Sequence, residues 1–186
     1  MKKLIAVFGP SDCKSGDVLY DSAEKLGYEL AIAGFVVVTG GYGGVMEAAS
    51  KGARKSNGSA IGITAEVYFA KGCEANEYVS REIKVKSAAD RLMELLDLPD
   101  AYIAIGQSSG TLVEVTMAWD YMTKGFLPNK PLLLIGETWR KFLDYIESDS
   151  MTESLMESCS TQEIAVNRLK EIFGEQKRLP DLEIIQ

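Results

Sequence analysis

The chain has 186 residues, 46% of them hydrophobic and 25% charged, so we expect one domain over residues 1–186 with a single sizeable core. Its net charge of −7, from 20 basic and 27 acidic residues, argues against nucleic acid or an anionic membrane as a partner. Histidine is absent, which excludes His-based triads and His-ligated metals, and we expect no metal site and no cofactor.

The expected location is the cytoplasm. No apolar run reaches the roughly 18 residues of a transmembrane helix, and the start of the chain leads straight into a strand-like segment rather than a signal peptide. Cys13, Cys73 and Cys159 are scattered and lack the spacing of a metal knuckle or a disulfide framework, which suits a reducing compartment. We therefore expect a soluble protein without a targeting segment.

Apolar runs of strand length alternate with stretches of helical periodicity along the chain. This alternation predicts a Rossmann-like, doubly wound α/β fold, with a mainly parallel sheet flanked by helices on both faces. The predicted strands are residues 3–8, 35–39, 59–64, 78–85, 101–105, 131–135 and a short edge strand at 154–158. The predicted helices are residues 15–33, 45–55, 88–96 with Ser87 as N-cap, 111–124, 139–148 and 162–173. Residues 65–76 are predicted to be a loop near the site, and residues 175–186 a surface tail.

The turn after the second predicted strand has the strongest functional pattern. Ligands of doubly wound sheets lie beyond the carboxyl ends of the strands, and this turn reads Thr39-Gly40-Gly41-Tyr42-Gly43-Gly44-Val45-Met46. Glycines let the backbone approach an anion, and the start of the following helix offers free N–H groups. The predicted phosphate-binding residues of this turn are Gly40, Gly41, Gly43, Gly44, Val45 and Met46.

Two other turns follow predicted strands. The turn after residues 101–105 offers backbone amides and hydroxyl groups that suit a phosphate, or that simply cap the next helix. The turn after the first strand could add a ligand contact. The predicted ligand-binding residues of these turns are Ser108, Ser109, Gly110, Thr111, Gly9 and Ser11. The dinucleotide fingerprint after the first strand and the P-loop pattern are both missing, which disfavours nicotinamide redox chemistry.

Two charged residues share this part of the predicted site. Glu114 lies three residues after Thr111, on the first turn of its helix, where a carboxylate can accept a ribose hydroxyl or stabilise developing positive charge. Arg91, in the helix before strand 101–105, could pair with a phosphate or with Glu114. Arg91 and Glu114 are therefore candidate ligand contacts at this end of the predicted site.

At these residues the sequence resembles a family once described as lysine decarboxylase-like. The family includes the LONELY GUY cytokinin-activating phosphoribohydrolases and the molybdenum cofactor carrier proteins, and the likeness covers roughly residues 3–146. Its glycine-rich turn, ending in Gly-Leu/Val-Met, looks like residues 39–46. Its hallmark, Pro-Gly-Gly-x-Gly-Thr-x-x-Glu, falls on residues 106–114, which keep the Gly-Thr and the Glu and lose the Pro-Gly-Gly. The family's active-site arginine falls on Arg91, with Leu92 in place of the usual lysine.

The resemblance leaves two functions open, and with them the question of whether the protein is an enzyme. One is a phosphoribohydrolase, in which Arg91 and Glu114 help to cleave the N-glycosidic bond of a nucleoside 5′-monophosphate into free base and ribose 5-phosphate. The other is a non-catalytic carrier or sensor of a nucleotide-like or pterin-phosphate ligand. The altered turn at 106–109 and Glu47, which the cytokinin branch typically lacks, favour the carrier.

The expected partners are a small nucleotide-like ligand with a phosphate and further copies of the chain. Members of the family commonly pair through helices near the active site, so the resemblance implies a homodimer or a higher even oligomer. The apolar face of residues 111–122 is the predicted contact.

Overall fold

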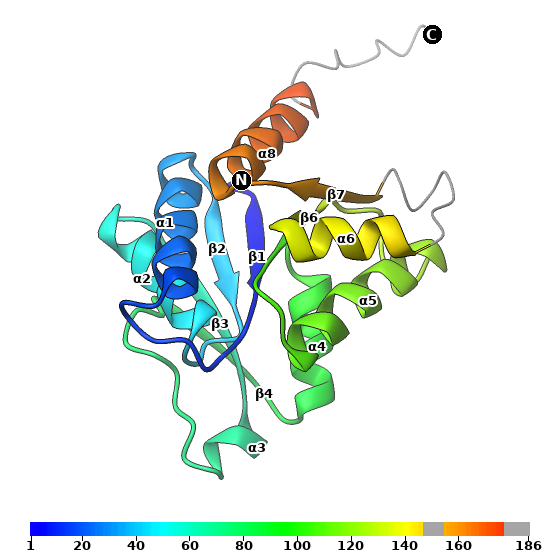
Figure 1. Ribbon diagram of the computed structural model, residues 1–186. Helices are drawn as coiled ribbons and strands as arrows, with labels where there is room; N and C mark the ends of the chain where they lie inside the picture. The colour runs from blue at the N-terminus through cyan, green and yellow to red at the C-terminus, as the bar shows by residue number, and fades with distance from the viewer. Residues whose placement is uncertain (147–154, 177–186) are drawn as a thin grey trace, which may run out of the picture.

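Seven parallel strands form one sheet in the order β4-β3-β2-β1-β5-β6-β7, and helices cover both of its faces (Figure 1). The computed structural model describes residues 1–146 and 155–176. The predicted Rossmann-like α/β fold class is confirmed. The strands are β1 (Leu4–Phe8), β2 (Val36–Thr39), β3 (Ala60–Ala65), β4 (Arg81–Val85), β5 (Ala101–Ile105), β6 (Leu132–Ile135) and β7 (Met156–Cys159).

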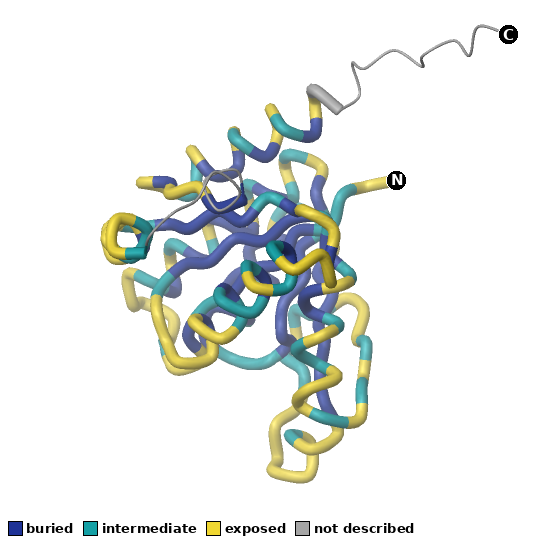
Figure 2. The backbone as a smooth tube through the Cα atoms, turned by 90° about the vertical axis from the view of Figure 1, so that its right-hand side faces the viewer, coloured by how far each residue is buried: buried dark blue, intermediate teal, exposed yellow. Residues whose placement is uncertain are grey.

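Helices form a layer on each side of the sheet. The described helices are α1 (Val18–Ile32), α2 (Val45–Lys55), α3 (Glu66–Phe69), α4 (Ala88–Asp97), α5 (Ser109–Thr123), α6 (Glu137–Tyr145) and α8 (Gln162–Gln176). Buried residues of α1, α2 and α8 pack in one apolar cluster, and those of α4, α5 and α6 pack in the other. Figure 2 shows the inner strands as the buried centre between helices whose outer turns are exposed.

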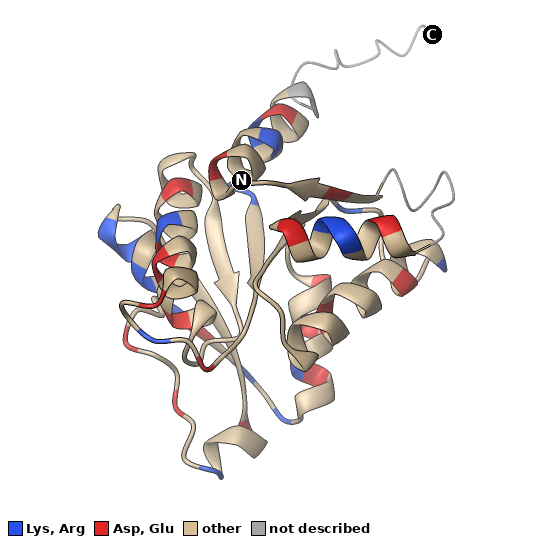
Figure 3. Cartoon of the chain, viewed as in Figure 1, with Lys and Arg blue, Asp and Glu red and all other residues tan. Residues whose placement is uncertain are grey.

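The strands divide their side chains between the two layers because successive residues of a strand point to opposite faces. In β1, Ile5 and Val7 belong to the cluster under α1 and α2, whereas Ala6 and Phe8 belong to the cluster under α4 and α5. Strands buried on both faces are continuously apolar, as the sequence of β1 is. Figure 3 shows that basic and acidic residues are interspersed along the helices, and that β1 and β2 carry neither.

The order of the strands creates a crevice beside β1. From β1 the chain moves outward through β2, β3 and β4, then returns to place β5 against the other side of β1 and continues outward to β7. In the β1–β5 pair, Phe8 lies opposite Ala104, so the turns that follow both strands emerge at the same edge of the sheet. Doubly wound sheets bind ligands at this reversal of strand order.

The predicted starts of the first helix and of the helix after β5 are wrong, each for a local reason. The first helix begins at Val18 rather than residue 15, because the Lys14 N–H donates to the Asp17 carboxylate in a preceding turn. The helix after β5 begins at Ser109, two residues earlier than predicted, since Ser108 caps it.

The segment between β3 and β4 also differs from its prediction. Residues 65–76, predicted as a loop, contain the short helix α3. Strand β4 begins at Arg81 rather than residue 78, because Asn76 organises a turn before it. The Asn76 carbonyl oxygen accepts the Val79 N–H, and its Oδ1 accepts the Tyr78 N–H.

Bounds in the C-terminal half differ from their predictions by similar amounts. Helix α6 runs over Glu137–Tyr145 instead of 139–148, strand β7 over Met156–Cys159 instead of 154–158, and α8 extends three residues beyond the predicted 173. The predicted bounds at residues 148 and 154 lie outside the described residues. The tail predicted at 175–186 is wrong at its first two residues, which belong to α8, and its residues 177–186 lie outside the described ranges. Of the helices in the described ranges, none combines the length and apolar character that crossing a bilayer requires.

The predicted contact face on α5 is largely part of the core. Val115, Ala118 and Met122 are buried against the sheet, so they are not available to a second chain. Leu112 and Val113 are exposed on the outer side of the helix. Assembly into a homodimer or a higher even oligomer stays a prediction.

Candidate functional site

A cleft of about 670 Å³ lies at the carboxyl ends of β1, β2 and β5. Its walls come from the turns after these strands, the segment that contains α3, and helices α4 and α5. The lining residues are Gly9, Ser11, Asp12, Tyr42, Gly43, Met46, Tyr68, Cys73, Arg91, Ser108, Ser109, Gly110, Thr111 and Glu114. The fold thus brings together residues from distant parts of the chain.

Most of the sequence-predicted site residues line this cleft. They are Gly9, Ser11, Gly43, Met46, Arg91, Ser108, Ser109, Gly110, Thr111 and Glu114. Gly40, Gly41, Gly44 and Val45 do not line it. Val45 is buried, and its N–H already donates to the carbonyl oxygen of Pro10 at 2.9 Å, so this N–H is not available to a ligand.

The glycine turn has a backbone geometry that favours glycine. Gly41 has φ of +78° and Gly44 has φ of +66°, and a Cβ on Gly44 would lie 2.4 Å from the carbonyl oxygen of Pro10. Within the part of the chain that the structure describes, the N–H groups of Tyr42, Gly43 and Gly44 meet no acceptor. Successive unpaired N–H groups before a helix form a concave surface that attracts anions.

The second turn presents the N-terminus of α5 to the same cleft. Ser108 is the N-cap: its Oγ accepts the Thr111 N–H at 3.1 Å and lies 2.8 Å from Thr111 Oγ1. This bond satisfies one of the free donors of the helix, while the N–H groups of Ser109 and Gly110 have no acceptor within residues 1–146 and 155–176. The capping role and an anion-binding role therefore coexist at this turn, because they use different N–H groups.

Arg91 is fixed at the cleft by carbonyl groups at the ends of two strands. Its Nε donates to the carbonyl oxygen of Ile63 and its Nη2 to that of Gly40, both at 2.8 Å. The rings of Tyr42 and Tyr68 lie 5.1 and 5.8 Å from its Cζ, at the distance of cation–π contacts. Burial lowers the pKa of Arg91, yet a guanidinium stays charged in proteins. Its Nη1 group has no acceptor in the described ranges, which leaves two donors for a ligand.

Glu114 lies half-buried on the second turn of α5, in the same cleft as Arg91. Its predicted place on the first turn is wrong because the helix begins two residues earlier than expected. Burial raises its pKa to about 7, and the charge of Arg91 limits the rise. No side chain or backbone group of the described residues donates a hydrogen bond to its carboxylate. At neutral pH both protonation states are populated, so Glu114 can accept a bond from a ligand hydroxyl, donate one, or transfer a proton.

Three lining residues were not singled out from the sequence: Tyr42, Tyr68 and Cys73. Tyr42 lies inside the glycine turn, so the motif marks its position although not its role. Its hydroxyl accepts the Ala65 N–H at 2.9 Å. Tyr68 and Cys73 belong to residues 65–76, which are predicted from the sequence to be a loop near the site. That predicted position is the one indication in the sequence that these two residues lie near the cleft.

The segment after β3 is fastened to the glycine turn by Asn76. Its side-chain Nδ2 donates to the carbonyl oxygens of Gly41 at 3.0 Å and Tyr42 at 2.9 Å, and its backbone N–H donates to the Gly41 carbonyl oxygen at 2.8 Å. These bonds occupy the carbonyl side of the turn. The N–H groups of Tyr42, Gly43 and Gly44 take no part in these bonds.

Comparison with known proteins agrees with this architecture. A family model described as the SLOG cluster4 family matches residues 2–164. An uncharacterized protein of Archaeoglobus fulgidus is 31% identical over 151 residues, which cover 79% of this chain and 96% of the relative.

Two solved structures resemble the chain over nearly their whole length. The molybdenum cofactor binding protein of the phototrophic bacterium Rippkaea orientalis is 27% identical, with a TM-score of 0.75, and the match covers 93% of this chain and 98% of that one. The molybdenum cofactor carrier protein of Chlamydomonas reinhardtii is 25% identical, with a TM-score of 0.76 and coverage of 94% and 99%. The similarity therefore extends over nearly the whole fold that builds the cleft.

Proposed function

This chain belongs to the SLOG cluster4 family, and from that membership we propose that it binds and carries a small molecule that joins a phosphate to a heterocycle. The molecule would be a nucleoside monophosphate or a pterin phosphate, such as the molybdenum cofactor that the two structural relatives bind or carry. The ligand site is the cleft between the glycine turn and the start of α5.

One observation carries the proposal: unpaired N–H groups from two turns and a fixed guanidinium line one cleft. The donors are the N–H groups of Tyr42, Gly43, Ser109 and Gly110 and the Nη1 group of Arg91. Helix N-termini and nests of backbone N–H groups stabilise phosphate without a large positive surface. Such local binding is what a chain with a net charge of −7 needs.

Carriage is favoured over catalysis by the surroundings of these donors. The hallmark turn of the resembling hydrolases is glycine-rich, whereas this chain has Gln107 and Ser108 there. The Ser108 side chain caps α5 rather than facing a ligand alone. The two structural relatives named above carry or bind a cofactor.

A second function, hydrolysis of an N-glycosidic bond, rests on Glu114. A carboxylate beside an oxocarbenium-like transition state stabilises its positive charge, and a carboxyl group with a pKa of about 7 can also deliver a proton to the leaving base. Arg91 would then hold the ligand against Glu114. Free base is the product that distinguishes this function from carriage.

The test compares one charge introduced inside the cleft with the same charge introduced far from it. A Cβ on Gly110 would meet only Ser108 Oγ, at 3.8 Å, and a Cβ on Gly174 would meet nothing within 4 Å, so a side chain fits at either residue. An aspartate at residue 110 suits the first turn of α5 but repels a phosphate. Calorimetric titration with AMP, GMP and a pterin phosphate is run on the wild type, Gly110→Asp and Gly174→Asp.

We expect at least one of these ligands to bind the wild type and Gly174→Asp equally, and Gly110→Asp at least tenfold more weakly. Equal affinity for both variants, or no binding of any ligand to the wild type, would overturn the proposal. Chromatography of the same mixtures reports free base. Base released by the wild type but not by Glu114→Gln would replace carriage with hydrolysis.

A further inference from the structure

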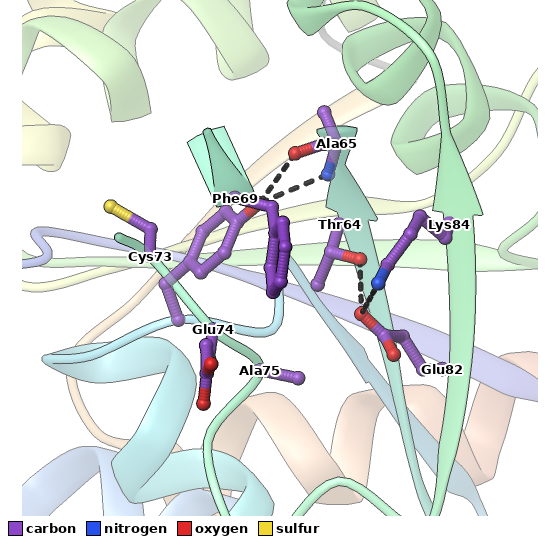
Figure 4. A pocket seen from close by; sticks show the side chains of 9 residues that line it. Thr64, Ala65, Phe69, Cys73, Glu74, Ala75, Glu82 and Lys84 are labelled. Carbon is purple, nitrogen blue, oxygen red and sulfur yellow. Dashed lines mark hydrogen bonds and ion pairs between the residues drawn. The ribbon is translucent and has the colours of Figure 1, made fainter. Parts of the chain in front are cut away.

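A second cavity of about 250 Å³ adjoins the cleft, and Tyr42 and Cys73 line both. Its other walls are the end of β3, the edge strand β4 and the segment after α3 (Figure 4). The remaining lining residues are Thr64, Ala65, Phe69, Glu74, Ala75, Glu82 and Lys84. A volume of this size has room for a bicyclic heterocycle of about a dozen non-hydrogen atoms, since one water takes about 30 Å³ in the liquid.

The edge strand directs two opposite charges into this cavity. Glu82 and Lys84 are two residues apart in β4 and so share one face of the sheet, while Ile83 between them packs against the core on the other face. Thr64 of β3 lies opposite Lys84 in the register of the two strands. The pairing of β3 with β4 thus fixes where both charged groups emerge.

A hydrogen bond orients the carboxylate of Glu82. The buried Thr64 hydroxyl donates to Glu82 Oε1 at 2.5 Å, and Lys84 Nζ lies 3.8 Å from the same oxygen (Figure 4). Glu82 Oε2 accepts no hydrogen bond from the described residues. The side chains therefore present a free carboxylate oxygen next to an ammonium group, an acceptor beside a donor.

Phe69 adds a flat apolar wall. Its side chain is 54% exposed, and Lys84 Nζ lies 4.9 Å from the centre of its ring. Figure 4 shows the Phe69 ring beside Thr64, Glu82 and Lys84. An exposed aromatic ring beside polar groups is the arrangement on which a planar heterocycle stacks while its edge forms hydrogen bonds.

Resting on the proposed function, we propose that this cavity binds the heterocycle of the ligand and selects a 2-amino-pyrimidin-4-one edge, the edge shared by guanine and pterins. Glu82 accepts the ring N–H and the exocyclic amino group, and Lys84 donates to the neighbouring carbonyl oxygen. Adenine offers no carbonyl to Lys84 and no N–H pair to Glu82. The phosphate stays at the turns of the cleft, and the ligand passes between the two cavities beside Tyr42 and Cys73.

Charged residues on an edge strand also serve to prevent pairing with other chains. That role would make Glu82 and Lys84 indifferent to the identity of a base. A binding subsite would make the affinity for a nucleotide depend on its base, whereas a strand that only prevents pairing would not. The difference in affinity between bases therefore distinguishes the two roles.

The experiment is calorimetric titration with GMP, IMP, AMP and ribose 5-phosphate. IMP differs from GMP only in lacking the 2-amino group. The proteins are the wild type, Glu82→Gln, Lys84→Met and the control Glu77→Gln, whose exposed residue lines neither cavity. Glutamine can still accept the Thr64 bond, so Glu82→Gln removes charge without removing the local structure.

We expect the wild type and Glu77→Gln to bind GMP at least tenfold more tightly than IMP or AMP, as one charge-assisted hydrogen bond predicts. Glu82→Gln should bind GMP and IMP within twofold of each other. Lys84→Met should weaken the binding of GMP and IMP at least fivefold and leave the affinity for AMP unchanged, because only GMP and IMP carry the carbonyl group. Equal affinity of the wild type for the three nucleotides, with ribose 5-phosphate bound, would overturn this inference alone. Failure of all four ligands to bind would overturn the proposed function as well.

Discussion

The guanidinium of Arg91 occupies the space in which any residue but glycine at position 40 would carry its Cβ. A Cβ on Gly40 would lie 1.6 Å from Arg91 Nη2, which donates to the Gly40 carbonyl oxygen at 2.8 Å. Glycine at this position therefore makes room for the cation of the cleft. Its role is to place Arg91 rather than to contact a ligand.

Gly40→Ala should accordingly displace Arg91 and break its bond to the Gly40 carbonyl. We expect a loss of about 2 kcal/mol in the free energy of unfolding, the usual contribution of a hydrogen bond to a charged group. Gly43→Ala is the matched control, because a Cβ there meets only the Ser11 carbonyl oxygen, at an ordinary 3.5 Å. Urea denaturation measures both variants.

The Arg91→Ala background tests the cause. With the guanidinium gone, the Gly40→Ala substitution should cost at least about 1 kcal/mol less than in the wild type, an interaction energy typical of residues in contact. If the cost of Gly40→Ala is the same in both backgrounds, Arg91 is not what requires glycine at position 40.

Glu114 makes stability depend on pH. Burial raises its pKa from 4.5 to about 7 in the folded protein, so the folded state binds more protons than the unfolded state between these values. Stability then falls as the pH rises from about 4.5 to about 7 and is level above that range. The full shift corresponds to at most about 3 kcal/mol, an upper bound because the cleft is open to water.

Glu114→Gln should remove this dependence. Urea denaturation at pH 5 and pH 8 is expected to show the wild type losing stability relative to Glu114→Gln between the two values. The difference in the free energy of unfolding between the two proteins cancels the contributions of the other titrating groups, because both proteins contain them. Parallel pH profiles for the two proteins would mean that Glu114 titrates normally.

Asn76 is predicted to hold the segment that contains Tyr68 and Cys73 against the glycine turn. Asn76→Ala removes the two bonds from Nδ2 to the Gly41 and Tyr42 carbonyl oxygens. We expect faster hydrogen exchange in residues 66–80, while exchange in β1 and β5 stays unchanged, because the bonds fasten one surface segment and not the sheet. Uniform exchange changes throughout the protein, or none in residues 66–80, would contradict this role.

The parts of the fold predicted from the sequence are those that depend on local patterns. Strand β5 is predicted with its observed bounds, Ala101–Ile105, because a buried parallel strand is a continuous apolar run bounded by turn residues. The Ser87 cap of α4 follows from its residue type, and the structure shows a capping box with Asp90. Residues near the cleft were found because strand ends in this fold converge at one edge.

What the sequence could not supply depends on contacts between distant segments. Helix α3 is four residues long, too short for a period to show, and its Tyr68 reaches Arg91 only through tertiary packing. Whether the Val45 N–H is free depends on Pro10, which lies far earlier in the chain. Predicting the cavity at Glu82 and Lys84 would have required the register of β3 with β4. Charged residues on an edge strand do not by themselves indicate a cavity.

Lys130 is a buried charge whose role is structural. It is 8% exposed, and its Nζ donates to the carbonyl oxygens of Leu96 at 2.8 Å and Asp97 at 2.7 Å, at the C-terminal end of α4. Burial lowers its pKa, whereas the helix end and the nearby carboxylates favour the charged form. The ammonium group therefore supplies donors to two carbonyl groups at the end of the helix, and the Leu96 carbonyl also accepts the Tyr102 hydroxyl.

Lys130→Met keeps much of the apolar stem but leaves the Asp97 carbonyl without this donor, whereas the Leu96 carbonyl still accepts the Tyr102 hydroxyl. We expect a loss of about 1–3 kcal/mol in the free energy of unfolding, the cost of an unsatisfied buried polar group. Lys124→Met, which removes an exposed pair with Asp120, should cost less than about 1 kcal/mol. Equal losses in urea denaturation of the two variants would show that the Lys130 bonds do not stabilise the end of α4.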